Sequence, residues 1–567
     1  MGLFNRWSLN LIFVFASLIY IGGLLVDVLE VDSAQYASIS GEMYREGNYL
    51  ELKQNGMDYL DKPPLVFWTA SWMYNIFGVH NWSFKLSSLL FSIIGLFSTY
   101  KVGYLLYNKR TGFISMLVLL TCQAFFLYNN DVRTDALLSG AVIFSIWQLI
   151  AYLYYKKWGN LIFGFAAIGV AMLAKGPIGI MVPVLAMGSY LIGKNKYKDI
   201  FKWQWLVGLG VTALVLLPMS YGLYTQFDAQ PEKQLNLPPN YNEPRDSVSG
   251  LHFYYWEQSF GRITGENEWK DTSGPGFFFG IFAYSFMPWS LIGFWAIFWR
   301  IINAARDFIL KRKKQEWLTL GGFVLPFLAF SSSQFKLDHY IYVSYPFAAV
   351  IVAEFILRVT QSKPAWWMNI LIAVQGLVIL ASLIVIYVIL IWAFPTNDII
   401  IWIGLIALLG LTFYFYLIDK DRLHKIILTS IFISLSVNWA LNFQLYPILT
   451  TEYQIGRKVA NHLEEKNINP KDVVVTKNTF IHQIKFYSKS NFRIFDMENM
   501  DEKDLSHKYI LIEENDLEAF KSDYSNVRIE SEYTSFHVSK LNMTFLNPET
   551  RAETLDKKYL VYLEQKL

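Results

Sequence analysis

The sequence predicts a polytopic α-helical membrane protein with a small C-terminal α/β domain outside the membrane. Of its 567 residues, 54% are hydrophobic and only 17% are charged, which is more apolar surface than one soluble core buries. Apolar runs of about 20 residues, the length that crosses the hydrocarbon layer, recur from Leu9 to Tyr446 and stop after Thr451. The net charge of +3 gives no ground for nucleic-acid binding. The single cysteine, Cys122, excludes an internal disulfide and a cysteine-built metal cluster.

We expect about thirteen transmembrane helices from the spacing of these runs. Their expected starts are Leu9, Lys85, Thr111, Asp135, Asn160, Pro177, Trp203, Phe277, Trp317, Tyr340, Trp366, Asp398 and Ile426. The first is interpreted as an uncleaved helix rather than a signal peptide, because no small-residue cleavage site follows it. The fifth and sixth are the shortest.

Positive charge is concentrated in alternate gaps between the runs. These gaps are Lys109-Arg110, Lys156-Lys157, Lys194 to Lys202, Arg306 to Lys314, Arg358 to Lys363 and Lys420 to Lys425. The positive-inside rule places them, with the N-terminus, in the cytoplasm. The outer loops 30–82 and 226–276 and the C-terminal residues then lie on the other face. We therefore expect a transmembrane domain over 1–450 and an extracytoplasmic domain over 451–567.

The C-terminal residues show a different pattern. Short alternating stretches such as Asp472-Val-Val-Val-Thr and Tyr509-Ile-Leu-Ile-Glu are separated by polar segments, which is typical of strands in a small mixed α/β domain. No motif in this domain indicates chemistry.

The outer loop after the first run begins with a candidate site residue, Asp32. Tyr36, Ile39 and Met43 follow at helical spacing, so an interfacial amphipathic helix that starts at Asp32 is predicted. The alternative is that Asp32 only caps the helix, where free amides stabilise a carboxylate.

The same loop contains Tyr59, Asp61 and Lys62 directly before Pro63-Pro64. Proline restricts the residue that precedes it, so Lys62 is held extended. A fixed ammonium is suited to a phosphate oxygen. The alternative is an interfacial lysine that reaches up to water.

Further charged residues lie at the outer ends of other runs. Asp131 and Asp135 flank the start of the fourth run, where a charge is costly unless it has a partner or a function. Arg133 is too close to Asp135 along the chain to be a certain partner of it. Lys175 lies between two short runs, in Lys-Gly-Pro, where the alternative is a simple hairpin turn.

The remaining candidates belong to two other outer loops. Glu257 and Arg262 accompany interfacial aromatic residues, and a guanidinium can bind two phosphate oxygens. Lys336, His339 and Tyr340 precede the tenth run. A lone histidine at an interface is more often a structural hydrogen-bonding group than a base. Cations, carboxylates and interfacial aromatic residues on one face of a membrane are suited to an anionic lipid-linked substrate.

At these residues the sequence resembles the GT-C superfamily of polyprenyl-phosphate-sugar glycosyltransferases, in the branch that contains lipid A aminoarabinose transferase and bacterial protein mannosyltransferase relatives. The motifs are Asn-Gly-Met-Asp-Tyr-Leu-Asp-Lys-Pro-Pro-Leu from Asn55, Asp32 to Met43, Ala174-Lys-Gly, Glu257 to Arg262, and Lys336-Leu-Asp-His-Tyr. The resemblance covers the membrane part. It implies thirteen helices, juxtamembrane helices and an external soluble domain.

The resemblance also implies residue roles. Asp32 matches the catalytic aspartate and Asp135 a second acidic site residue, while Lys62 and Arg262 match groups that hold the carrier phosphate. A second set, also expected to bind substrate, is Tyr59, Asp61, Asp131, Lys175, Glu257, Lys336, His339 and Tyr340. Asp61 stands where relatives have a glutamate in an acidic site that can hold a divalent metal.

The implied protein is a monomer in a bacterial inner membrane, with its active site and C-terminal domain in the periplasm. Its donor is a sugar on undecaprenyl phosphate, and its acceptor is lipid A or a protein hydroxyl. The chain departs from the family at Ser33 and Gln35, where an acidic residue and an arginine are usual, which removes hard oxygen ligands from any metal site. No metal is therefore assigned.

Two readings of other classes remain open. A transporter or flippase would use many helices as well, but it predicts charges at the membrane midplane and paired broken helices. The second is a lipid or sugar sensor without catalytic activity, which the departures from the family at Ser33 and Gln35 make possible.

Overall fold

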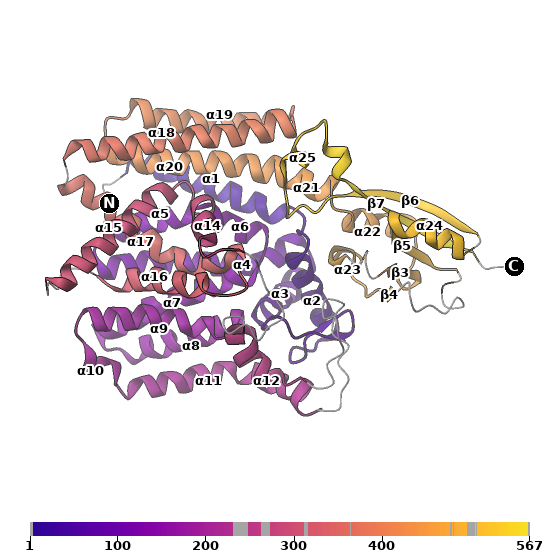
Figure 1. Cartoon of the computed structure of the whole chain (residues 1–567), viewed down its shortest axis with the longest axis horizontal. Coiled ribbons are helices and arrows are strands. Elements are labelled where there is room, and N and C mark those ends of the chain that lie inside the picture. Colours follow the sequence, from indigo (N-terminus) through magenta and orange to yellow (C-terminus); the bar gives the residue numbers. More distant parts are fainter. Residues whose placement is uncertain are drawn as a thin grey trace.

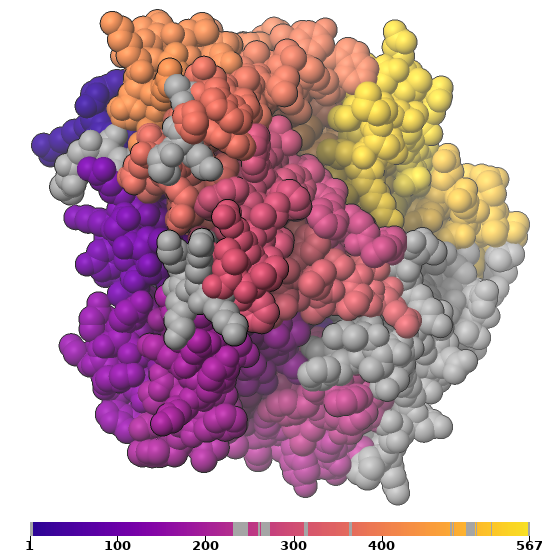
Figure 2. All heavy atoms as spheres, turned by 60° about the vertical axis from the view of Figure 1, so that its left-hand side comes forward, coloured from indigo at the N-terminus to yellow at the C-terminus, as the bar shows by residue number. Residues whose placement is uncertain are grey.

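A computed structural model describes residues 4–230, 248–261, 273–310, 316–362, 364–476, 479, 481–495, 505, 507–524 and 526–564. Long helices run side by side through most of the molecule, and a smaller unit of strands and short helices lies at one end of them (Figure 1). The N-terminus and α10 (Tyr197–Ile200) lie at the opposite end (Figure 1). In the space-filling view the C-terminal residues, in yellow, form one edge of the molecule (Figure 2).

The long helices have the length and composition of membrane spans. They are α1 (Arg6–Leu25), α4 (Asn81–Leu106), α7 (Thr134–Tyr155), α8 (Trp158–Lys175), α11 (Gln204–Leu223), α17 (Tyr345–Ser362), α18 (Ala365–Tyr387), α19 (Ile399–Phe413) and α20 (Arg422–Ala440). Within the described residues, nine helical segments are long and apolar enough to cross a membrane. The predicted polytopic membrane fold is confirmed.

Several predicted spans are short or interrupted. The helices of these spans are α5 (Lys109–Leu120), α6 (Gln123–Asn130), α9 (Ile178–Gly193), α14 (Phe277–Ser285), α15 (Ser290–Ile309) and α16 (Leu318–Ser331). The third predicted run is bent by 52° between α5 and α6. The eighth begins on α14 and continues, after a break at Met287-Pro288, as α15. Every predicted start lies on or beside an apolar helix, and the total of thirteen crossings stays a prediction.

Shorter helical elements connect or extend these helices. They are α12 (Gly250–His252), η1 (Tyr224–Asp228), η2 (Phe253–Gly261), η3 (Asp338–Ser344), η4 (Val388–Ala393), η5 (Tyr414–Ile418), η6 (Leu441–Leu445) and α21 (Tyr446–Glu452). Because η6 and α21 continue α20, the last apolar helix extends to Glu452, beyond the predicted end at Tyr446.

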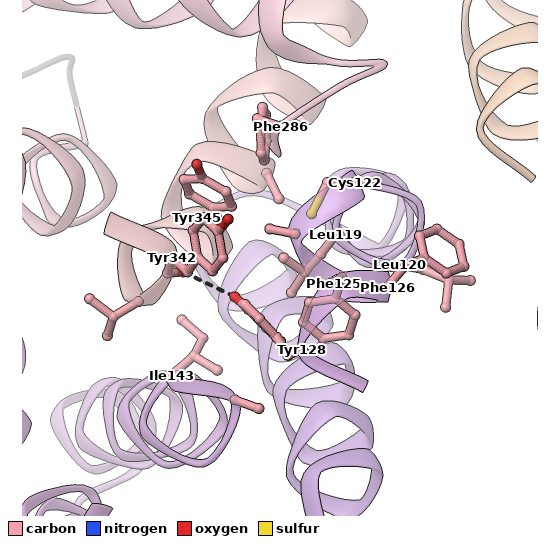
Figure 3. Packing of buried hydrophobic residues seen from close by; sticks show 14 of the residues in the cluster. Leu119, Leu120, Cys122, Phe125, Phe126, Tyr128, Ile143, Phe286, Tyr342 and Tyr345 are labelled. Atoms are coloured by element: carbon pink, nitrogen blue, oxygen red, sulfur yellow. Dashed lines mark hydrogen bonds between the residues drawn. The ribbon is translucent and has the colours of Figure 1, made fainter. Parts of the chain in front are cut away.

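The bundle core is filled by aromatic and branched side chains from helices distant in sequence. Tyr128 of α6 packs against Phe125 of the same helix and against Tyr342, which packs in turn against Tyr345. The Tyr128 hydroxyl donates to the Tyr342 carbonyl at 3.4 Å (Figure 3). Small residues let helices approach closely. A Cβ on Gly140 of α7 would lie 2.3 Å from the Phe91 carbonyl oxygen of α4.

The segment after α1 forms α2 (Asp32–Glu46), a hairpin of β1 (Lys53–Gln54) and β2 (Met57–Asp58), and α3 (Leu65–Phe77). The helix that was predicted to start at Asp32 does start there, and Tyr36, Ile39 and Met43 are buried. The interfacial position predicted for α2 stays a prediction, but the helix exposes no polar face over residues 33–43. Every residue of 33–43 except Gln35 is buried, because α3 and the C-terminal unit cover α2 from two directions.

The C-terminal unit is built on a five-stranded sheet with strand order β4-β3-β5-β7-β6. Its strands are β3 (Val473–Thr476), β4 (Arg493–Phe495), β5 (Tyr509–Glu513), β6 (Val527–Ser535) and β7 (Asp556–Leu563). Its helical elements are α22 (Gly456–Glu465), η7 (Pro470–Asp472), α23 (His482–Ser488), α24 (Glu514–Asp523), α25 (Met543–Leu546) and η10 (Arg551–Thr554).

Both predicted strands, β3 and β5, are present in this mixed sheet. Val473 and Val475 pack in one hydrophobic cluster and Val474 in another. Both faces of the sheet are therefore covered, which explains why these strands are apolar throughout. The domain boundary at residue 450 stays a prediction.

Candidate active site

Arg133 joins three of the predicted site residues. It lies in the short turn between α6 and α7. Its Nη1 lies 2.8 Å from Asp32 Oδ2, and its Nε lies 2.8 Å from Asp131 Oδ2. Burial alone would lower the pKa of Arg133, yet the Asp131 and Asp32 carboxylates raise it well above its ordinary value. The guanidinium thus fixes the direction of both carboxylates.

The same guanidinium sets the proton position of His339. Arg133 Nη1 lies 3.2 Å from His339 Nδ1. An arginine can only donate, so Nδ1 accepts, and a neutral ring carries its proton on Nε2. That Nε2 lies 3.7 Å from Asp135 Oδ2. His339 therefore links the Asp32 group to Asp135.

Asp135 and Lys175 form a buried ion pair. Lys175 Nζ donates to Asp135 Oδ1 at 2.6 Å, and their side chains are 9% and 1% exposed. Lys175 ends α8 and Asp135 lies in the first turn of α7, so each charge is stabilised by its helix dipole. The ammonium also lies 4.4 Å from the centre of the Tyr340 ring. Lys175 therefore neutralises a buried carboxylate, in addition to its place at the turn between two helices.

Lys62 lies in the wall of a largely apolar cavity. Its Nζ bonds to Asp61 Oδ2 at 2.7 Å, and Pro64 caps α3 directly afterwards. The cavity walls include Tyr59, Lys62, Trp68, Met219, Tyr254 and Gln258. The side-chain amide of Gln258 donates to the Asp61 carbonyl.

Tyr36 connects the Lys62 region with the Asp32 region. It is buried on α2, one turn after Asp32, and packs edge-on against Phe67. Burial raises the pKa of its hydroxyl well above the ordinary value, and the Asp32 and Asp61 carboxylates raise it further. The buried Tyr36 hydroxyl therefore interacts electrostatically with both Asp32 and Asp61. The sequence indicated Tyr36 only as an apolar position of a helix.

The other predicted residues have separate contacts. Glu257 Oε1 lies 3.0 Å from His252 Nδ1, one turn away, and its neighbour Gln258 lines the cavity. Lys336 Nζ donates to the Ser273 carbonyl at 3.0 Å. Arg262 lies outside the described residues.

The residues around Asp61 do not fit a divalent cation. The Lys62 ammonium at 2.7 Å opposes a second positive charge there. Ser33 is buried, and the Gln35 amide donates to Gln54 Oε1 at 3.0 Å. Within the part of the chain that the structure describes, no group of three or more histidine, cysteine or acidic residues could hold a metal.

Glu30, two residues before Asp32, gives a pH-dependent prediction. Burial raises its pKa from 4.5 to about 8. The folded state then binds this proton more tightly than the unfolded state, so the stabilisation is complete below about pH 4.5 and is lost as the pH rises through about 8. Between about pH 5 and about pH 8 the unfolding temperature should therefore fall less for the Glu30→Gln variant than for the wild type.

Thermal unfolding in detergent across this pH range is the measurement. Glu46→Gln is the control, because Glu46 is exposed at the end of α2. It should keep the wild-type pH dependence. Equal slopes for wild type and Glu30→Gln would contradict the buried, protonated state of Glu30.

Sequence comparisons place the chain near lipid-carrier glycosyltransferases. Residues 61–221 match the family of dolichyl-phosphate-mannose-protein mannosyltransferases. The undecaprenyl phosphate-alpha-4-amino-4-deoxy-L-arabinose arabinosyl transferase of Shewanella sediminis is 23% identical over 62% of this chain and 60% of that protein. The protein of the same name from Edwardsiella ictaluri is 24% identical over equal shares. The chain thus spans about 60% of the length of these relatives.

Structural comparison decides the fold. The crystal structure of ArnT from Cupriavidus metallidurans in the apo state matches with a TM-score of 0.71 over 97% of each chain, at 15% sequence identity. The chain has the GT-C fold. ArnT bound to undecaprenyl phosphate matches with a TM-score of 0.74 at equal identity and coverage. The resemblance to GT-C polyprenyl-phosphate-sugar glycosyltransferases, predicted from the motifs, is confirmed, and the structural match covers 97% of the chain.

Proposed function

We propose that this GT-C protein transfers a sugar from undecaprenyl phosphate to an envelope acceptor, with lipid A as the preferred acceptor. The observation that carries the proposal is the connected series Asp32–Arg133–His339–Asp135–Lys175, together with the Lys62 ammonium in the wall of an apolar cavity. An apolar lining is the chemistry that a lipid chain requires, and an ammonium is the chemistry that a phosphate requires. The names of the similar arabinosyl transferases favour a pentose as the sugar.

In the proposed reaction an acceptor oxygen attacks the anomeric carbon of the sugar while the bond from that carbon to the carrier phosphate breaks. The leaving phosphate gains negative charge, which Lys62 stabilises at the cavity wall. Arg262 is the second cation that we propose for this phosphate. The product is inverted at the anomeric carbon because attack and departure occur on opposite faces.

Asp32 is proposed to act on the acceptor side. Its side chain is 40% exposed, so an acceptor can reach it, and Arg133 holds its carboxylate in place. If the acceptor is a hydroxyl, Asp32 removes its proton as a general base. If the acceptor is a lipid A phosphate, no proton leaves, and Asp32 stabilises the positive charge that develops at the sugar carbon.

Mass spectrometry of lipid A and of envelope glycoproteins tests this proposal. The cells should express the wild type, Asp32→Asn, or neither. We expect a sugar-sized mass increment on lipid A with wild type alone. An increment on glycoproteins alone would favour the protein mannosyltransferase alternative, which the family match over residues 61–221 supports. Identical spectra in all three cases would favour transport or sensing.

Lys62 gives a binding prediction. Lys62→Gln should weaken binding of undecaprenyl phosphate about tenfold or more, because a hydrogen bond between charged groups contributes about 1.5–3 kcal/mol. Binding of the carrier phosphate to the purified protein is the measurement. Lys53→Gln is the matched control, since Lys53 pairs with Glu51 on the same outer segment and does not line the cavity. Equal affinities for the two variants would contradict the assignment of Lys62.

We further propose that the membrane is the bacterial inner membrane, with the C-terminal unit in the periplasm. The basic gaps and the N-terminus support this orientation through the positive-inside rule. The proposed working form is a monomer.

A further inference from the structure

The short helix α23 of the C-terminal unit is bonded to the chain just before Asp32. Gln483 N donates to Glu30 Oε1 at 2.6 Å, and the Gln483 side-chain amide donates to the Val28 carbonyl. From the segment that precedes α22, Gln454 Oε1 accepts the Glu30 amide at 2.8 Å. The backbone that leads into α2 is therefore held by the C-terminal unit.

The same unit holds the hairpin that leads to Lys62. The Asn55 side chain accepts from Phe492 N at 3.0 Å and donates to Phe492 O at 2.6 Å. His482 Nδ1 lies 3.3 Å from Gln54 Nε2. Burial, and to a smaller extent the charge of Lys485, lower the pKa of His482 to about 3, so the ring is neutral at physiological pH and can accept this bond.

Glu42 joins α2, the hairpin and α23 at one point. Its carboxylate pairs with Lys485, and both side chains are buried, at 2% and 0% exposure. The carboxylate also accepts the backbone amides of Asn55 at 2.8 Å and Gly56 at 2.7 Å. An ammonium and two backbone amides thus stabilise the negative charge of the buried Glu42 carboxylate. If the ammonium is lost, an uncompensated charge stays buried, which is unfavourable.

We propose that Lys485 and Gln483 are positioning residues, which fix the segment that carries Asp32 relative to the segment that carries Lys62. The inference rests on the proposed function, in which Asp32 serves the acceptor side and Lys62 the carrier phosphate. These two groups come from separate segments, and a small displacement between reacting groups slows a reaction strongly. The C-terminal unit thereby acquires a role in catalysis without a catalytic residue of its own.

Lys485→Met in the full-length protein is the first test. Amide hydrogen exchange at Asn55 and Gly56 should become faster, since Glu42 loses its fixed position. We expect kcat for sugar transfer to fall about tenfold or more, while KM for the carrier-linked sugar changes little, because no residue of the C-terminal unit lines the cavity. Gln483→Met removes only the side-chain bond to Val28 and is the milder second variant, with a smaller fall in kcat.

Arg300→Met is the matched control. Arg300 is also buried and paired, at 3.2 Å from Glu316 and 3.5 Å from Glu354, where α4 ends and α16 begins. Loss of this pair should lower the unfolding temperature and leave kcat per folded molecule near the wild-type value. If both variants lose kcat in proportion to their loss of stability, or if Lys485→Met leaves kcat unchanged, the inference is wrong.

The exchange measurement separates this inference from the proposed function. A wild-type protein that transfers no sugar would contradict the proposed function alone. Unchanged exchange at Asn55 and Gly56 in both Lys485→Met and Gln483→Met would overturn the positioning role, whatever the activity of the wild type.

Discussion

Asp32→Asn is expected to lower the rate of sugar transfer by about 10²- to 10⁴-fold, the range that a positioned acid or base contributes. Asparagine keeps the shape of the side chain and can still accept a bond from Arg133, but it has neither the charge nor the basicity. Carrier binding should remain near the wild-type value, because Lys62 and the cavity are untouched. Transfer rate and carrier affinity of the purified variant are the measurements.

Asp131→Asn is the control for this variant. Asp131 is the other carboxylate that Arg133 binds, at the same 2.8 Å. The Asp131→Asn variant removes one negative charge beside Arg133 and leaves Asp32 unchanged. We therefore expect its transfer rate to fall much less than that of Asp32→Asn. Equal losses would show that the charge balance around Arg133, rather than Asp32 itself, controls the rate.

Lys175→Met is expected to have the largest effect on stability. Asp135 is 1% exposed, and without Lys175 it keeps a buried negative charge, with His339 Nε2 3.7 Å from its Oδ2. Removal of one partner of a buried pair typically costs about 3–5 kcal/mol of unfolding free energy. Unfolding in detergent, monitored by temperature or denaturant, measures this change.

The double variant Asp135→Asn/Lys175→Met separates charge burial from packing. A neutral side chain at each position removes the uncompensated charge, so most of the lost stability should return. Transfer should not return, because Asp135 belongs to the proposed site. A double variant as unstable as Lys175→Met alone would show that packing around Lys175, rather than the unpaired carboxylate, causes the loss.

The features that the sequence predicted correctly are encoded locally. The start of α2 at Asp32, the strands at Val473 and Tyr509 and the apolar helices each follow from a pattern within about 20 residues. The motif around Lys62 could also be recognised in the sequence, because two prolines restrict its backbone. The family resemblance added the expectation of a shared site.

The features that were missed depend on contacts across long stretches of chain. Arg133 binds Asp32 across 101 residues and contacts His339 across 206, and no local pattern indicates such pairs. Lys485 reaches Glu42 across 443 residues, which is also why the burial of α2 was not predicted. One signal was present: Arg133 is the single cation between Asp131 and Asp135, at an outer turn where unpaired charges are costly.

The central claim is that this protein cleaves a sugar from a polyprenyl phosphate carrier and transfers it. The most direct test uses the purified protein in liposomes that contain undecaprenyl phosphate-linked aminoarabinose and lipid A, with both lipids followed by mass spectrometry. For the wild type we expect equal amounts of free undecaprenyl phosphate and of lipid A with one added sugar, and for Asp32→Asn we expect neither product. Donor that stays intact, or that moves unchanged from one leaflet to the other, would contradict it.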